Sequence, residues 1–581
     1  MKPATLRVFR ILRKLGLWRT YRSWRAMALL IVLLTPLPAL AYDELFQGGF
    51  EAITDAPASD AEAARFLTMA TFGPTPSEIA HLRAVGYAQW LAQQLSMPAT
   101  LQRPYVEALD AGVQNPGQSD RMQIWFANAV TAPDQLRQRM AWALSQIMVV
   151  SDGLSHLGQD PIALAEYSDV LARDSLGYYD NSGTLQAGTY SALLYDVTKS
   201  PAMAKMLTYL RNKKGDEALG TSPDENYARE VMQLFSIGLV LRNLDFSPVL
   251  DSHGDPIPTY DQDMVVSYAK VFTGWSYSTG FNSNPQGLNW APADYEPLIC
   301  YEIYHDESEK SLLDNEVAPG GPNSCEPDLD AGLAAISNHQ NVAPFISRQL
   351  IERFTTSNPS PAYIERVASV FANDGAGHYG NLGAVIVAVL TDPEARYGAA
   401  PPPAPYVFGK AREPLLKLTA LWRYYGAAAI DGSYAFPNPQ KNYAQRPLGA
   451  PSVFNFYLPD YLPPGELADA GLYGPEFQII NESTGVSTAN DLTNRVNDYV
   501  GNPANDDTTI AIDLSALMPL ASTPASLVAQ LNHDLMYGAM SSSMTTTMTD
   551  MVTALPASNP TGRVTGALQV LLASPEFAIE K

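Results

Sequence analysis

The chain has 581 residues, of which 37 are basic and 60 are acidic, so its formal net charge at neutral pH is −23. Residues 1–41 hold eight of the basic residues and none of the acidic ones, which leaves 29 basic against 60 acidic residues in the remainder. Such an acidic chain argues against a nucleic-acid partner, because phosphate backbones are bound by clustered lysine and arginine.

Residues 1–41 have the composition of an export signal. Their basic residues precede an apolar run at 26–34 and an Ala-Leu-Ala cleavage pattern at 39–41. The apolar segment is short and is interrupted by Pro36 and Pro38, so it is a poor membrane-spanning helix. We therefore predict a periplasmic or secreted protein with no stable membrane span after signal cleavage. The alternative is an uncleaved anchor.

Most of the remaining chain has the periodicity of amphipathic helices. The first, Asp60–Ala70, stops at Gly73, and a capping box at 75–78 with proline at the first helical position opens the next one. Gly86 is expected to close that second helix. The helical pattern continues over 136–147, 193–210 with a break at 200–201, 263–273, 342–354, 362–372, 382–390, 414–425, 525–535 and 566–572.

The helix that opens at Pro223 is expected to carry a polar face. Ser222 and Glu225 are placed to form its capping box, and Gly238 is placed to end it. The face opposite its apolar stripe holds only polar side chains: Asn226, Arg229, Glu230 and Gln233. This face either lines a site or is a solvated surface.

Strand signals are confined to a short hairpin at 248–258. The stretch 274–328 is too long for a tight connection, and loops of that length are usually functional. We predict a mainly α fold of two helical lobes with short β-hairpins and long ordered loops. The proline-rich 399–405 divides an N-terminal lobe, 42–400, from a C-terminal lobe, 401–581.

Cys300 and Cys325 are the only cysteines, 25 positions apart. In an oxidising compartment we expect them to form a disulfide, which would stabilise the fold by about 3 kcal/mol in the chain-entropy model. The alternative is a pair of reduced thiols. A zinc site is poorly supported, because no C-x-x-C spacing exists and only His305 lies between the two cysteines.

Short motifs along the chain carry a family resemblance. They lie at 64–67 (ARFL), 72–75 (FGPT), 87–95, 200–203 (SPAM), 223–230 (PDENYARE), 260–275, 305–306 with Lys310, 345–350 (FISRQL), 409–414 (GKAREP), 451–457 (PSVFNFY), 475–477 (PEF) and 574–577 (SPEF). On these motifs the chain resembles, over about residues 60–578, the large bacterial exported family catalogued as domain of unknown function 1800.

The resemblance implies an exported, mostly helical protein, often encoded beside a partner that looks like a sulfatase or alkaline phosphatase relative. It supplies no established reaction. The family usually has asparagine at the position of Asp224 and an acidic residue at that of Gln233, so no role that needs a carboxylate at 233 is carried over.

Three segments hold candidate chemistry. In the first, Glu230 is a general base or metal ligand oriented by Arg229 and Asn226; the alternative is a cap and ion-pair network between helices. In the second, His305 and Asp306 with Lys310 sit in the loop that the disulfide would close; the alternative is Asp306 capping a turn while His305 packs beside tyrosines.

The third segment joins 410–414 to the aromatic run 454–461. Tyr457 in that run, together with Trp275, is expected to stack on sugar rings; the alternatives are core packing and buried ion pairs at a helix start. Four aspartates at 251–263 do not follow the EF-hand order. The sequence therefore predicts no metal site and identifies no cofactor.

Two functions are compatible with these residues. The first is an exported hydrolase that acts on an extracellular polymer or its sulfated or phosphorylated fragments. In this hydrolase Glu230 and His305 transfer protons, and Asp306 orients the histidine. Arg229 and Lys310 hold an anionic group of the substrate. The second is a non-catalytic binding or assembly partner of an exported sulfatase- or phosphatase-like protein, with a glycan as a further candidate ligand.

Overall fold

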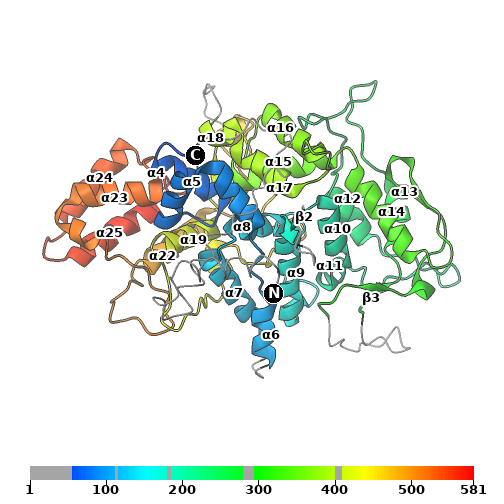
Figure 1. The fold of residues 1–581 in the computed structure, drawn as a ribbon, viewed down its shortest axis with the longest axis horizontal. Helices are drawn as coiled ribbons and strands as arrows, with labels where there is room; N and C mark the ends of the chain where they lie inside the picture. Colours follow the sequence, from blue (N-terminus) through cyan, green and yellow to red (C-terminus); the bar gives the residue numbers. More distant parts are fainter. Residues whose placement is uncertain are drawn as a thin grey trace, which may run out of the picture. The chain divides into compact units, whose positions relative to one another are not determined.

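The computed structural model describes residues 55–111, 115–179, 185–186, 188–278, 294–398 and 408–580. The predicted signal peptide, 1–41, and the proline-rich 399–405 lie outside these ranges. The described residues belong to one compact unit. Its secondary structure is almost entirely helical, so the prediction of a mainly α fold is confirmed (Figure 1).

The helices of the first half are α4 (Asp60–Ala70), α5 (Pro76–Ser96), α6 (Arg103–Ala111), α7 (Gln118–Thr131), α8 (Gln135–Ser145), α9 (Pro161–Asp174), α10 (Tyr190–Lys199), α11 (Pro201–Met206), α12 (Asn226–Gln233) and α13 (Gln262–Val271). Those of the second half are α14 (Cys325–Asn338), α15 (Val342–Phe354), α16 (Pro361–Ala372), α17 (Leu382–Thr391), α18 (Pro393–Tyr397), α19 (Pro414–Tyr424), α20 (Gln440–Tyr443), α21 (Glu466–Asp469), α22 (Glu482–Arg495), α23 (Pro524–Met536), α24 (Ser542–Ala554) and α25 (Pro560–Ala573).

Strands in the described ranges form only two-stranded antiparallel pairs. They are β1 (Tyr178–Tyr179) with β2 (Leu185–Gln186), β3 (Trp275–Ser276) with β4 (Ile299–Cys300), β5 (Lys310–Ser311) with β6 (Val317–Ala318), and β7 (Lys410–Ala411) with β8 (Ile579–Glu580). Short 3-10 turns lie at Leu157–Gln159, Glu302–Tyr304, Leu313–Asn315, Pro475–Gln478 and Met518–Ser522.

The predicted capping box at the start of α5 is present. The Thr75 hydroxyl accepts from the Glu78 amide at 3.1 Å, and the Glu78 carboxylate accepts from the Thr75 amide at 3.0 Å. The prediction that Gly86 ends this helix is wrong: Gly86 has φ +81°, but the chain re-enters the helix and continues to Ser96. Re-entry places Tyr87 against Phe66, with ring centroids 4.9 Å apart, so that both rings are buried.

The turn between α4 and α5 requires glycine at position 73. Gly73 has φ +121°, and a Cβ atom there would lie 2.5 Å from the Cα atom of Ala420. The glycine therefore lets the turn approach α19, although about 350 residues separate them along the chain.

The start of α12 differs from the sequence prediction. The helix begins at Asn226 with Glu225 as its cap residue, so the expected capping box of Ser222 and Glu225 is wrong. The backbone of Asp224 is held instead by the Asn212 side chain, which accepts from the Asp224 amide at 2.9 Å. The Asp224 carboxylate then accepts from the Asn226 amide, the first amide of α12, at 2.8 Å.

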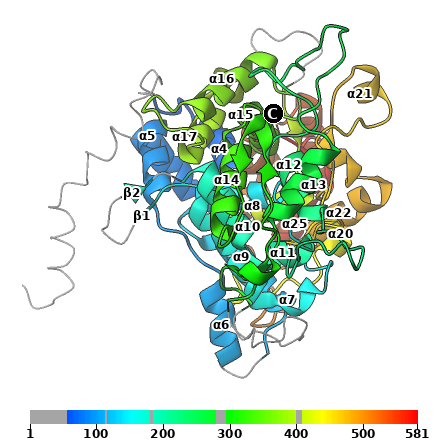
Figure 2. The same ribbon diagram turned by 90° about the vertical axis from the view of Figure 1, so that its right-hand side faces the viewer.

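Two helical groups surround the segments discussed below. Helices α15, α16 and α17 pack against one another in the upper part of Figure 1. Helix α13 packs between α12 and α14, while α10 packs on α14, and these four helices lie toward the viewer in Figure 2. The disulfide between Cys300 and Cys325, with Cα atoms 6.3 Å apart, joins β4 to the first residue of α14.

One large hydrophobic core contains residues from both sides of the predicted lobe boundary. The Phe126 ring packs edge-on against Trp422 and Phe436, with centroid distances of 5.7 and 5.4 Å. Trp142 stacks on Phe456 at 6.2 Å. Among the helices of the described ranges, none combines the length and the apolar character that crossing a bilayer requires.

Candidate functional site

The first half of the α12 polar face faces solvent. The Arg229 guanidinium donates to Glu225 Oε2 and Gln262 Oε1, both at 3.1 Å, and 40% of its side chain is exposed. The Asn226 amide lies 3.4 Å from the Thr208 hydroxyl. These contacts connect the start of α12 to α13 and to the segment that follows α11.

Glu230 lies on a buried part of α12, with 8% of its surface exposed. Burial raises the pKa of its carboxyl above the ordinary value, while the charge of Arg229 acts in the opposite direction. Within the described ranges Glu230 Oε2 has no hydrogen-bond partner, and no hydrogen bond joins Glu230 to His305.

His305 and Lys310 lie in the protein interior with no exposed side-chain surface. The carboxylate that contacts both is that of Asp328 in α14, whose Oδ2 lies 3.0 Å from His305 Nε2 and 2.5 Å from Lys310 Nζ. Burial acts to raise the pKa of Asp328, but the hydrogen bonds from His305 and Lys310 lower it below the ordinary value.

Asp306 does not take the orienting role that the sequence predicted for it. Its carboxylate accepts from the backbone amide of Ser308 at 2.9 Å, while Asp328 occupies the position beside the histidine ring. Burial acts to raise the pKa of Asp306, but the bonds from Ser308 lower it below its ordinary value. The structure thus leaves Arg229, Glu230 and His305 in three different surroundings, of which only that of Arg229 is open to solvent.

Of the two aromatic residues predicted to bind substrate, one lines a large cavity. Trp275 is buried, with the Lys199 ammonium 4.2 Å from the centroid of its ring. Tyr457 is buried too, but it lies in the wall of a cavity of about 490 Å³, and its hydroxyl donates to Gln146 Oε1 at 3.0 Å. Volumes in this range are typical of small-molecule sites.

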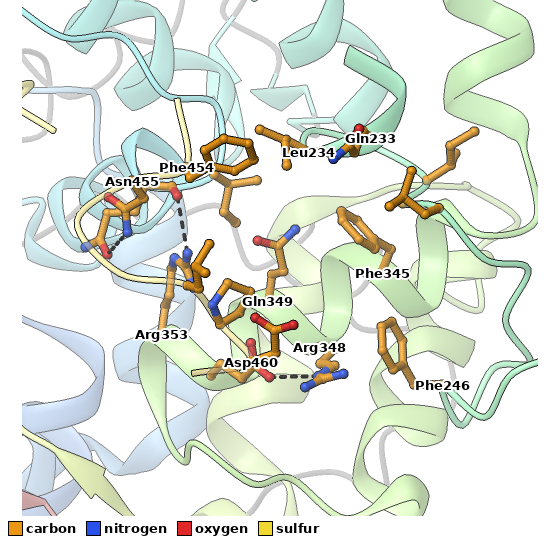
Figure 3. A pocket seen from close by; sticks show the side chains of 18 of the residues that line it. Gln233, Leu234, Phe246, Phe345, Arg348, Gln349, Arg353, Phe454, Asn455 and Asp460 are labelled. Carbon is orange, nitrogen blue, oxygen red and sulfur yellow. Dashed lines mark hydrogen bonds and ion pairs between the residues drawn. The ribbon is translucent and has the colours of Figure 1, made fainter. Parts of the chain in front are cut away.

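Four segments of the chain form this cavity (Figure 3). They are residues 146–147 directly after α8, the end of α12 and the loop after it at 233–246, α15 at 345–353, and the loop 453–460. The apolar part of the lining includes Leu234, Phe246, Phe345 and Phe454. Phe454 is 47% exposed, so an aromatic ring stands open at the edge of the cavity.

Two guanidinium groups stack on the Phe246 ring. The Cζ atoms of Arg242 and Arg348 each lie 4.5 Å from the ring centroid. Arg348 is paired with Glu352, whose Oε1 accepts from its Nε at 2.7 Å. Arg242 donates to the Phe246 carbonyl at 3.2 Å, and no carboxylate of the described ranges pairs with it.

Among the residues that the structure describes, Arg242 is thus a cation without a counter-charge in the cavity lining. Partial burial, followed by the positive charge of Arg348, lowers the pKa of Arg242 below its ordinary value. A guanidinium remains charged despite such a shift. An anion placed beside Arg242 would relieve both the desolvation and the repulsion.

Buried polar atoms without partners gather in the inner wall of the cavity. Within the described ranges they are Gln349 Nε2, Glu352 Oε2, Arg353 Nε and Asn455 Oδ1. In Figure 3 the Gln349 amide points into the space between Phe345 and Arg353. Buried polar groups are normally hydrogen-bonded, so these atoms favour a polar ligand in the cavity.

A buried network of charged and polar groups around Glu413 holds the side chains of this cavity wall in place. Glu413 Oε2 accepts from Trp142 Nε1, Gln146 Nε2 and Gln445 Nε2 at 3.0, 3.0 and 2.9 Å. Burial acts to raise the pKa of Glu413, but the charges of Lys410 and Arg139 lower it below its ordinary value. Because Glu413 fixes the amide nitrogen of Gln146, the amide oxygen is left to accept from Asn455 and Tyr457 in the cavity wall.

The sequence indicated some of these residues and missed others. It singled out 410–414 and the aromatic run that contains Phe454 and Tyr457, and it noted Gln233, which lines the cavity. Arg242 was missed because the segment after α12 has no periodicity. The α15 residues were visible only as a family motif at 345–350, with no indication of which side chains face a cavity.

A family model described as "Protein of unknown function (DUF1800)" matches residues 65–579, which is most of the chain. The chain belongs to this family. The resemblance stated from the sequence motifs is therefore confirmed, although the family description carries no activity. No curated protein and no solved structure matches the chain.

Proposed function

We propose that this protein is an exported binding protein whose cavity holds an anionic ligand with an apolar or ring face, such as a sulfated or phosphorylated fragment of an extracellular polymer. The observation that carries the proposal is the unpaired Arg242 guanidinium beside a cavity lined by Phe246, Phe345 and Phe454. Aromatic surface would accept the ring face, and the guanidinium would accept the anion through charge-assisted hydrogen bonds.

The position of the predicted proton-transfer residues favours binding over hydrolysis at those residues. His305 has no exposed surface, and no hydrogen bond links it to Glu230 within the described ranges. An assembly role beside an exported sulfatase- or phosphatase-like protein remains a prediction from the family resemblance. Such a partner would supply or consume the anionic fragment.

Replacing Arg242 with glutamine is expected to weaken binding of phenyl sulfate and phenyl phosphate. Loss of a charge-assisted hydrogen bond costs about 1.5–3 kcal/mol, which corresponds to roughly tenfold to a hundredfold in Kd. Titration calorimetry of both probes, with the uncharged phenyl glucoside for comparison, measures the change. The control is Arg83→Gln, which removes an exposed arginine paired with Asp60 outside the cavity lining. Equal affinity of the Arg242→Gln and Arg83→Gln variants for phenyl sulfate would reject the proposal.

Hydrolysis remains a second candidate function, and Glu352 is the observation that favours it. This buried carboxyl lines the cavity, its Oε2 has no partner in the described ranges, and burial raises its pKa above the ordinary value against the charges of Arg348 and Arg353. Such a group suits the protonation of a leaving oxygen.

Glu352→Gln tests this second candidate separately. If Glu352 is a general acid, release of phenol from phenyl sulfate or phenyl phosphate should fall by about 10²–10⁴-fold while probe binding is retained. The enzyme assay and the calorimetry are run on the same preparations. Turnover of either probe by Glu352→Gln at the wild-type rate would exclude Glu352 as a general acid. If the wild-type protein itself turns over neither probe, binding is the function of the cavity for these probes.

A further inference from the structure

A lysine, an aspartate and a histidine meet in the interior beside the disulfide, and the proposed function uses none of them. Lys310 Nζ in β5 lies 2.5 Å from Asp328 Oδ2 in α14. His305 Nε2 lies 3.0 Å from the same oxygen and 3.4 Å from Nζ. None of the three side chains has any exposed surface.

Thr273 determines where the protons of His305 lie. Its carbonyl oxygen is 2.9 Å from Nδ1 and can only accept. Its hydroxyl already donates to the Lys270 carbonyl at 2.6 Å, so at 3.2 Å from Nδ1 it also accepts. Nδ1 therefore carries a hydrogen. The 3.0 Å contact between Nε2 and Asp328 Oδ2 then needs a second proton between these two atoms, because two lone pairs would repel.

The charge balance of the cluster follows from these protons. With a proton between His305 and Asp328, an ammonium group on Lys310, which also donates to the Asp306 carbonyl, would give this fully buried cluster a net positive charge. An interior of low dielectric opposes such a charge. Transfer of one proton away from the Lys310 ammonium would make the cluster neutral and would give Nζ a lone pair. The Lys310 amine would then lie against the Asp328 carboxyl group, whose Oδ2 already contacts the proton donor His305 Nε2.

We propose that Lys310 and Asp328 become joined by an isopeptide bond after folding. The lone pair of Nζ attacks Cγ of Asp328, so the N–C bond forms and the C–Oδ2 bond breaks. Oδ2 leaves as water, with one proton from His305 Nε2 and one from Nζ, and His305 becomes neutral with its hydrogen on Nδ1. No oxidant or cofactor is needed.

The position of the cluster suits this step. The native fold holds amine and carboxyl in contact, which replaces a bimolecular encounter by an intramolecular one of high effective concentration. Asp328 Oδ1, which would become the amide oxygen, has no hydrogen-bond partner within the described ranges. The bond would tie β5 to α14 three residues beyond Cys325, and it would persist when the disulfide is reduced.

Mass spectrometry of the reduced, denatured and trypsin-digested wild-type protein tests the proposal. The expected result is one branched peptide that contains both residues, is lighter than its two parts by one water molecule, and is not cleaved after Lys310. The internal control is Lys410 with Glu476, a buried pair 3.0 Å apart without a histidine contact, which should be recovered as separate peptides. Recovery of Lys310 and Asp328 in separate unmodified peptides would overturn the proposal.

Two variants test the roles of the individual groups. Lys310→Arg keeps a cation but removes the nucleophilic amine, so its digest should contain the Asp328 peptide in unmodified form. His305→Ala removes the proton donor, and at least a tenfold loss of the branched peptide is expected. Undiminished cross-linking in His305→Ala would contradict the role of the histidine. The wild-type digest decides the existence of the bond even if a variant fails to fold.

Discussion

Replacing Lys410 with methionine is expected to lower the free energy of unfolding by about 3–5 kcal/mol, the usual cost of removing one partner of a buried ion pair. Lys410 Nζ lies 3.0 Å from Glu476 Oε1, and the two side chains are only 2% and 1% exposed. Nζ also donates to the carbonyls of Glu352 and Arg353 at 2.8 and 3.0 Å. The variant leaves a carboxylate and two carbonyls buried without their donor.

Denaturant unfolding of the wild-type protein and the variant, followed by the same spectroscopic probe, measures this loss. Arg83→Met is the control, because Arg83 and Asp60 are each 43% exposed and such pairs contribute about 0–1 kcal/mol. Combining Lys410→Met with Glu476→Leu should restore part of the loss, since both charges are then absent. Similar losses in Lys410→Met and Arg83→Met would show that the buried pair is not what stabilises this region.

The same network connects stability to the cavity. Lys410 donates to two carbonyls at the end of α15, the helix that supplies Arg348, Gln349 and Glu352 to the cavity wall. Its charge also lowers the pKa of Glu413, which holds the Gln146 amide. Apolar side chains of similar volume would fill this space as well, but they would not orient the polar groups of the wall.

The helices were predictable because their signals are local. The capping box at Thr75 and Glu78 and the apolar stripes lie within a few residues of the elements they define. The start of α12 was mispredicted because the decisive contact is not local: Asn212, 12 residues upstream, holds Asp224 so that the cap lies further along the chain. A capping box read from four residues cannot include such a contact.

The cavity was not predictable as a site because it combines segments hundreds of residues apart. Arg242 comes from a loop, and the neighbouring Arg348, which pairs with Glu352, comes from α15. Nothing in the sequence shows that Glu352 pairs with Arg348 and leaves Arg242 unpaired. The sequence also placed His305 correctly in the disulfide-closed loop, but it could not show that Asp328, rather than Asp306, would contact the ring.

The buried Lys417 is expected to make the free energy of unfolding depend on pH. Burial, and secondarily the charge of Arg412, lowers the pKa of Lys417 from the ordinary 10.5 to about 8. Below pH 8 the lysine is charged in both states, and the folded protein bears the full cost of the buried charge. Between pH 8 and 10.5 the unfolded chain retains a proton that the folded protein has released, so the contribution of this group to stability rises with pH.

Lys417→Met is therefore expected to raise the free energy of unfolding at pH 7 by up to about 3 kcal/mol, the equivalent of the pKa shift. The gain over wild type should shrink as the pH rises from 8 to 10.5, because the wild-type lysine becomes neutral there. Denaturant unfolding of both proteins at several pH values measures this difference in the free energy of unfolding. The control is Lys441→Met, which changes an exposed lysine of α20 and should alter the free energy of unfolding by a small amount that is the same at every pH. A gain for Lys417→Met that is independent of pH would mean that improved packing, rather than removal of a buried charge, is its cause.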